Sequence, residues 1–142
     1  MKGKAIVRLV LSGSLLLLTL TLALAAQRIP LHGGSDMRSA QGEALISDAA
    51  GGIKELAITA QGLEPNEVYT AWLVRMEPKM AMTGLRGGGS AFTSDAKGNG
   101  RYTGTVSATE LGKWQQIKIA HHPDRNPRNM KNIRSALVGN LK

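Results

Sequence analysis

Three methionines lie within seven residues of one another in this chain: Met76, Met80 and Met82. Thioether sulphur and imidazole nitrogen are ligands that suit copper. The chain contains no cysteine, so a site that needs sulphur would have to use methionine. Together with His121, the three methionines form a candidate copper site that could hold Cu(I). The competing interpretation is that these flexible side chains fill gaps in a hydrophobic core.

Two adjacent histidines, His121 and His122, lie at the end of a predicted strand. Successive side chains of a strand point to opposite faces, so only one of the two can reach a given ion. His121 shares the face of Ile117 and Ile119. Outside a metal site, we expect it to be a rim or core histidine with a satisfied hydrogen bond.

Basic residues recur at every third position near the C-terminus. One of them precedes Asn126-Pro127 and three follow it. This pair is typical of a helix N-cap and first helical position. On a short helix the basic residues would form a cationic stripe able to bind carboxylates or phosphates. The candidate partner-binding residues are Arg125, Arg128, Lys131 and Arg134.

An acidic protein, an anionic lipid surface or an acidic polysaccharide would suit such a stripe. Nucleic acid is not expected, because no aromatic residues for base stacking are interleaved. Residues 113–142 carry seven basic side chains against one acidic side chain, a net charge of +6. Residues 27–112 carry eight basic and nine acidic ones, a net charge of −1. The asymmetry indicates a partner, although a solvated basic surface is the competing interpretation.

Motifs of common enzyme classes are incomplete. Gly88–Phe92 lacks the second glycine of a nucleophile elbow. Asp95–Gly100 places Lys97 where an EF-hand needs an oxygen ligand. Leu85–Ser90 lacks the lysine of a phosphate-binding loop. We therefore expect no enzyme, no catalytic residues and, outside the copper alternative, no cofactor.

Residues 1–26 have the order of a secretory signal peptide. Three basic residues precede a nearly uninterrupted apolar run over 9–24, and small residues then offer a cleavage site near Ala25 or Ala26. The mature chain would be periplasmic or secreted. The alternative is an uncleaved anchor, but the run is shorter than the roughly 20 residues that a membrane span needs. No transmembrane span is expected in the mature chain.

Short segments rich in β-branched and aromatic residues follow, with turn signals between them. This spacing predicts an all-β fold, an antiparallel β-sandwich of about seven strands over residues 43–142. The predicted core contains Leu56, Ile58, Trp72, Leu73, Val74, Ile117 and Ile119. The predicted strands are 43–49, 54–61, 68–75, 90–94, 101–107, 113–120 and 135–141.

The segments between these strands have distinct compositions. Residues 27–42 lack periodicity and are predicted to be a flexible lead-in. The glycine-rich segment 76–89 is predicted to be a long loop, and 95–100 the turn of a hairpin. One helical turn is expected at 108–112, and a short helix after Asn126-Pro127.

The stretch Gly62–Val74, Gly-Leu-Glu-Pro-Asn-Glu-Val-Tyr-Thr-Ala-Trp-Leu-Val, resembles a phrase in small extracytoplasmic Ig-like domains. These include the C-terminal domain of anti-sigma-K-type factors, where a Leu-Pro turn enters a Tyr-x-x-Trp-Leu strand. The later Phe92-Thr-x-Asp-x-x-Gly-x-Gly segment is similar too. The resemblance covers about residues 60–110 and implies an Ig-like sandwich without adding chemistry. The sequence thus predicts a secreted or periplasmic binding module, with a copper-handling protein as the alternative.

Overall fold

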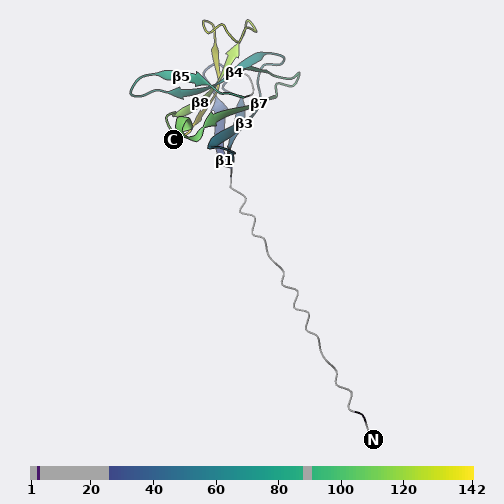
Figure 1. Ribbon diagram of the computed structural model, residues 1–142. Coiled ribbons are helices and arrows are strands. Elements are labelled where there is room, and N and C mark those ends of the chain that lie inside the picture. Colours follow the sequence, from purple (N-terminus) through teal and green to yellow (C-terminus); the bar gives the residue numbers. More distant parts are fainter. Residues whose placement is uncertain (1–2, 4–25, 88–90) are drawn as a thin grey trace.

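The computed structural model describes residues 3, 26–87 and 91–142. These residues form an antiparallel β-structure with one short helix, α1 (Figure 1). The prediction of an all-β antiparallel fold is confirmed. The elements are β1 Gln27–Gly33, β2 Gln41–Ala49, β3 Ile53–Gln61, β4 Val68–Arg75, β5 Ala81–Gly84, β6 Ala91–Thr93, β7 Gly100–Ser107, α1 Ala108–Leu111, β8 Gln116–His122 and β9 Arg134–Asn140.

The strands of the described part belong to one continuous, curled sheet. The order is β5-β4-β8-β9-β1-β2-β3-β7, and β6 pairs with β4 on the edge that β5 also uses. The curl brings the two ends together: Arg86, just after β5, forms a bridge with Thr105 of β7. The two N–H···O distances of this bridge are 2.9 and 2.6 Å. It satisfies backbone groups that an open sheet edge would leave unpaired.

The core lies inside the curl and is built from alternate residues of the strands. All but one of the predicted core residues are buried, although Val74 is buried outside the core cluster. The exception is Trp72, which is half-buried on the face opposite Leu73. There its indole nitrogen donates to the hydroxyl oxygen of Thr70 at 2.7 Å, so this side chain supports a polar contact outside the core.

The predicted flexible lead-in is wrong for residues 27–33. They form β1, which lies between β9 and β2, with Ile29 and Leu31 buried in the core. Pro30 lies within this strand although it cannot donate a ladder hydrogen bond. The structure places Pro30 where β1 is paired with β2 alone, since β9 pairs only with His32 and Gly33. Among the described residues, the paired strands therefore begin at Gln27 instead of residue 43.

Two further predictions about connections are corrected. The long loop at 76–89 contains β5, which pairs with Trp72–Arg75. The turn 95–100 does not close a hairpin, because β6 pairs with β4 whereas β7 pairs with β3. Instead, the turn packs on the β3–β4 connection through two backbone hydrogen bonds, from Leu63 to Gly98 and from Asn66 to Asp95.

The apolar part of the predicted signal peptide lies outside the described residues. Among the residues that are described, no helix is long and apolar enough to cross a membrane. The helix α1 confirms the helical turn expected at 108–112; the Ser107 hydroxyl caps it by accepting from the Glu110 N–H.

The contact between the turn 95–100 and the β3–β4 connection depends on Gly98. Its φ of 78° lies in the left-handed region, and an added Cβ would collide with the carbonyl oxygen of Leu63. Gly51 has a similar φ of 75° but open space around it. We expect Gly51→Ala to lower the free energy of unfolding by about 1 kcal/mol and Gly98→Ala by at least about 2 kcal/mol. Urea unfolding of both variants measures this.

The two glycines have similar φ angles, so the difference between the two losses of unfolding free energy measures the collision with Leu63. Equal losses of unfolding free energy in the two variants would contradict the prediction, because they would show that the Leu63 carbonyl moves away from the added Cβ at no cost.

Candidate functional sites

The methionines and His121 lie at opposite ends of β4. Met82 pairs with Val74, whereas His121 pairs with Tyr69. Five residues of strand separate these positions, about 16 Å at the usual rise. Met76 and Met80 are exposed and follow β4 at the same end as Met82. The structure therefore does not bring the predicted copper ligands together.

The segment that carries the basic residues, 123–133, is not a helix but a series of turns between β8 and β9. Short polar side chains take the backbone N–H groups that a helix would need. Asp124 accepts from the Asn126 N–H at 2.9 Å, Asn126 from the Arg128 N–H at 3.1 Å, and Asn129 from the Lys131 N–H at 3.1 Å. Such local bonds compete with helix formation. The predicted helix after Asn126-Pro127 is wrong for this reason.

The buried His122 fixes this segment, which we call the basic loop, to the sheet. Its Nδ1 lies 3.1 Å from the carbonyl oxygen of Asn129, and its Nε2 lies 2.8 Å from the Thr70 hydroxyl. A carbonyl can only accept, so Nδ1 carries the proton and Nε2 accepts from Thr70. His122 therefore connects the loop to the outer face of β4.

All four predicted partner-binding residues are exposed on the basic loop or at its end. Arg125 is engaged: its Nε donates to Glu67 Oε2 at 3.2 Å. Arg128, Lys131 and Arg134 form no ion pair within the part of the chain that the structure describes. The loop thus presents three unneutralised cations, although on a frame of turns and not as a helical stripe.

His121 points away from His122, as the strand alternation predicted, and is buried on the inner face. Only 1% of its side chain is exposed, and its ring stacks on Tyr69 with a centroid distance of 5.0 Å. Neither ring nitrogen has a hydrogen-bond partner among the described residues. The expectation of a rim or core histidine is met, but its expected hydrogen bond is absent there.

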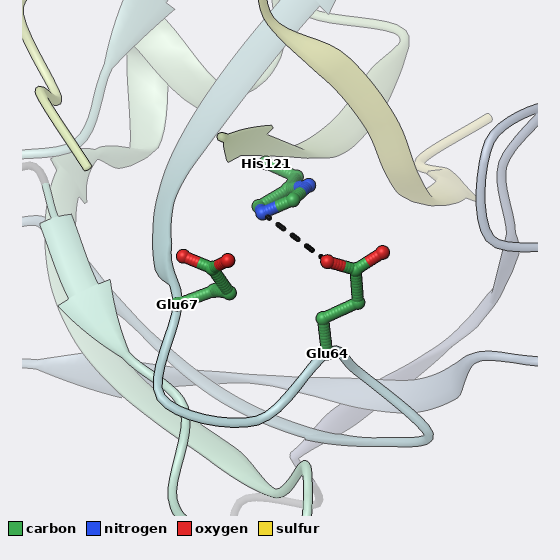
Figure 2. A group of neighbouring side chains, drawn as sticks. All are labelled: Glu64, Glu67 and His121. Carbon is green, nitrogen blue, oxygen red and sulfur yellow. Dashed lines mark ion pairs between the residues drawn. The ribbon is translucent and has the colours of Figure 1, made fainter. Parts of the chain in front are cut away.

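Two carboxylates face His121 from the β3–β4 connection. Figure 2 shows Glu64 and Glu67 pointing toward the imidazole, and Nε2 lies 4.0 Å from Glu64 Oε2. One ligand atom from each of the three residues lies within 4.8 Å of the other two. The structure thereby assembles a carboxylate–histidine cluster, Glu64, Glu67 and His121, at the end of the sheet where the basic loop begins.

The local sequence explains why the two carboxylates meet. Pro65 sets the backbone of the turn, and Asn66 accepts a φ of 56°. The Ser94 hydroxyl then holds both ends: it accepts from the Glu67 N–H at 3.0 Å and donates to the Glu64 carbonyl oxygen at 2.6 Å. The turn that carries the carboxylates is therefore held by its neighbours.

Tyr69 adds a second constraint on the same turn. Its hydroxyl oxygen accepts from the Glu64 N–H at 3.0 Å and lies 3.3 Å from the Glu64 carbonyl oxygen, to which it can donate. Burial raises the pKa of Tyr69 to about 12, so the phenol stays neutral and keeps its proton for donation. The same ring stacks on His121, so one side chain positions both halves of the cluster.

The environment of His121 favours its neutral form. Burial lowers the pKa of the imidazole below its usual range; Glu64 and Glu67 oppose this shift, and Arg134 and His122 add to it. A neutral imidazole offers a lone pair on one of its two nitrogens. The cluster therefore combines a buried, neutral imidazole, which offers a nitrogen lone pair, with two acidic side chains.

Sequence reasoning identified His121 but missed Glu64 and Glu67. The signal was present: two glutamates three residues apart flank Pro65-Asn66, a pair that closes a turn. The local sequence does not contain the pairing of Tyr69 with His121. This pairing places the turn with the two glutamates opposite the imidazole.

The chain was compared with known families and proteins. No family model matches it, and no curated protein is significantly similar to it.

The two unpartnered nitrogens of His121 lead to a test of stability. We expect His121→Leu, measured with a chelator present, to raise the free energy of unfolding at neutral pH by about 1 kcal/mol, because it removes a buried polar group without a partner. As pH falls below about 6.5, the unfolded wild-type chain takes up a proton that the folded imidazole resists. Wild-type stability should therefore fall, relative to the variant, through that range.

Urea unfolding of both proteins between neutral and mildly acidic pH measures the difference. The variant keeps His32 and His122, so the only histidine removed is His121. A difference in unfolding free energy that does not change with pH would contradict the lowered pKa of His121.

Proposed function

We propose that the protein is a non-catalytic binding module that attaches to an anionic surface through its basic loop. The observation that carries the proposal is the set of three exposed cations without ion-pair partners in the described part of the chain, Arg128, Lys131 and Arg134. Their loop is held by side-chain hydrogen bonds and by His122. A fixed loop loses less conformational entropy on binding than a mobile one.

Among anionic partners, a lipid surface fits the loop best. Met130 lies between Arg128 and Lys131 and is exposed, which places an apolar side chain among cations. That combination suits the boundary of a membrane, where basic groups meet head groups and an apolar group enters the acyl region. An acidic protein or polysaccharide would use the cations alone.

The expected location of the protein agrees with this proposal. The order of basic, apolar and small residues over 1–26 supports a signal peptide and a periplasmic or secreted mature chain. The hydroxyl of Tyr69, bonded to backbone groups five residues upstream, resembles the tyrosine corner of Ig-like domains. It supports the proposal that the curled sheet is an Ig-like sandwich.

Copper handling is a separate proposal, and the set of ligands that it requires differs from the set predicted from the sequence. Met76, Met80 and Met82 lie on or beside the β4–β5 hairpin, away from His121. Any Cu(I) bound there would depend on thioether ligands without that histidine.

Binding to vesicles tests the proposed function. Each cation near an anionic membrane contributes about 1 kcal/mol. The triple variant Arg128→Gln, Lys131→Gln, Arg134→Gln should therefore bind phosphatidylglycerol-containing vesicles about 100-fold more weakly than the wild type. Co-sedimentation of residues 27–142 with such vesicles, and with pure phosphatidylcholine vesicles, measures the change.

A matched control removes the same net charge at the opposite end of the sheet. Lys79, Lys113 and Lys142 lie beside the β4–β5 hairpin, before β8 and after β9. Their replacement by glutamine should leave binding nearly unchanged. Equal weakening in both triple variants, or no vesicle binding by the wild type, would refute the role of the loop.

A further inference from the structure

His121 is buried in a position that the protein alone does not satisfy. With 1% of its side chain exposed, neither nitrogen has a hydrogen-bond partner in the described part of the chain. Buried polar atoms are normally paired, and exceptions call for an explanation. The Glu64 carboxylate lies 4.0 Å from Nε2, which is beyond hydrogen-bond range.

Nε2 faces carboxylate oxygens, which cannot donate a hydrogen bond to its lone pair but can, like that lone pair, ligate a cation. Glu64 and Glu67 point toward the imidazole (Figure 2). One imidazole nitrogen with two carboxylates is a donor set used for Zn²⁺ and related divalent ions. A cation between them would give Nε2 a partner and offset the repulsion of the two carboxylates.

We propose that Glu64, Glu67 and His121 form a binding site for a divalent transition-metal ion of the Zn²⁺ class. Three protein ligands leave at least one position on the ion open to water. The site is independent of the basic-loop proposal, since it uses none of Arg128, Lys131 and Arg134.

The geometry needs only movements that these side chains can make. Ligand atoms at about 2.1 Å from a tetrahedral ion lie about 3.4 Å from each other, so separations of up to 4.8 Å must close by about 1.4 Å. His121 is held by its stack on Tyr69, and the backbone of the turn is held by Ser94. Rotation about the side-chain bonds of Glu64, which is 56% exposed, supplies movement on one side.

Arg125 now neutralises one of the carboxylates. The arginine side of its pair with Glu67 is in solvent, with 65% of the Arg125 side chain exposed, whereas the Glu67 side chain is 19% exposed. The pair rests on the 3.2 Å contact from Nε to Glu67 Oε2, which a divalent ion, with its higher charge, can replace. Arg125 would then be released and would join the three free cations of the basic loop.

The second nitrogen of His121 limits the affinity. Metal-bound histidines normally donate their other N–H to an acceptor, and loss of that partner weakens binding 10- to 100-fold. Nδ1 has no such acceptor among the described residues. We therefore expect a dissociation constant for Zn²⁺ in the micromolar range and not the nanomolar range.

Titration of residues 27–142 with ZnCl₂, followed by calorimetry and by the melting temperature, tests the site. We expect one equivalent of Zn²⁺ to bind and the melting temperature to rise. Glu64→Gln and Glu67→Gln should each weaken binding at least 10-fold, and His121→Leu should abolish it. The Glu64 side chain is 56% exposed, so Glu64→Gln adds no buried polar group and keeps the test valid if another variant fails to fold.

Glu43→Gln is the matched control. Glu43 is a partly exposed glutamate that pairs with Arg28 on another strand pair, and its replacement should leave Zn²⁺ binding unchanged. Absence of heat and of a melting shift at Zn²⁺ concentrations well above micromolar would overturn the proposal. So would binding that survives all three ligand variants, because the ion would then lie elsewhere.

Discussion

The phenol of Tyr69 is fully buried, so its hydroxyl group has to find its hydrogen bonds inside the protein. It does so on the backbone of Glu64, five residues earlier in the chain. The same ring lies between Phe92 and His121, at centroid distances of 5.5 and 5.0 Å. One side chain therefore fixes the entry into β4, the position of the carboxylate-bearing turn and the ring of His121. The end of the sheet that holds the carboxylate–histidine cluster is organised around it.

That end of the sheet also carries the basic loop, and the two are joined by charge. Glu67 faces both His121 and Arg125, so a change at the cluster alters the electrostatics of the loop. On the opposite face of β8, His122 connects the loop to Thr70 and, through it, to Trp72. The adjacent histidines thus have different roles: His122 supports the loop, and His121 lies in a polar cluster with no hydrogen-bond partner among the described residues.

The strands were predictable where the local sequence is strongly biased: β4, rich in β-branched and aromatic residues, has the predicted bounds, and β3, whose burial alternates, begins one residue earlier than predicted. Predictions from local sequence patterns failed where a neighbouring strand or side chain determines the backbone conformation. Pro30 is compatible with β1 because the ladder with β9 is limited to His32 and Gly33. The turns of the basic loop arise because asparagine side chains capture N–H groups that helix geometry would use. The candidate site was only partly predictable, since Glu64 and Glu67 meet His121 through strand register, which no local pattern contains.

The position of β1 between β2 and β9 has a consequence for how the chain acquires its structure. The first strand of the domain cannot complete its pairing until the last strand is available, because His32 and Gly33 pair with residues of β9. Contacts between such distant parts of a chain carry a high entropic cost and form slowly. A chain that emerges from its N-terminal end would therefore remain incompletely folded until nearly every residue has been delivered. Completion of the sheet is then a late, whole-chain event and does not proceed strand by strand.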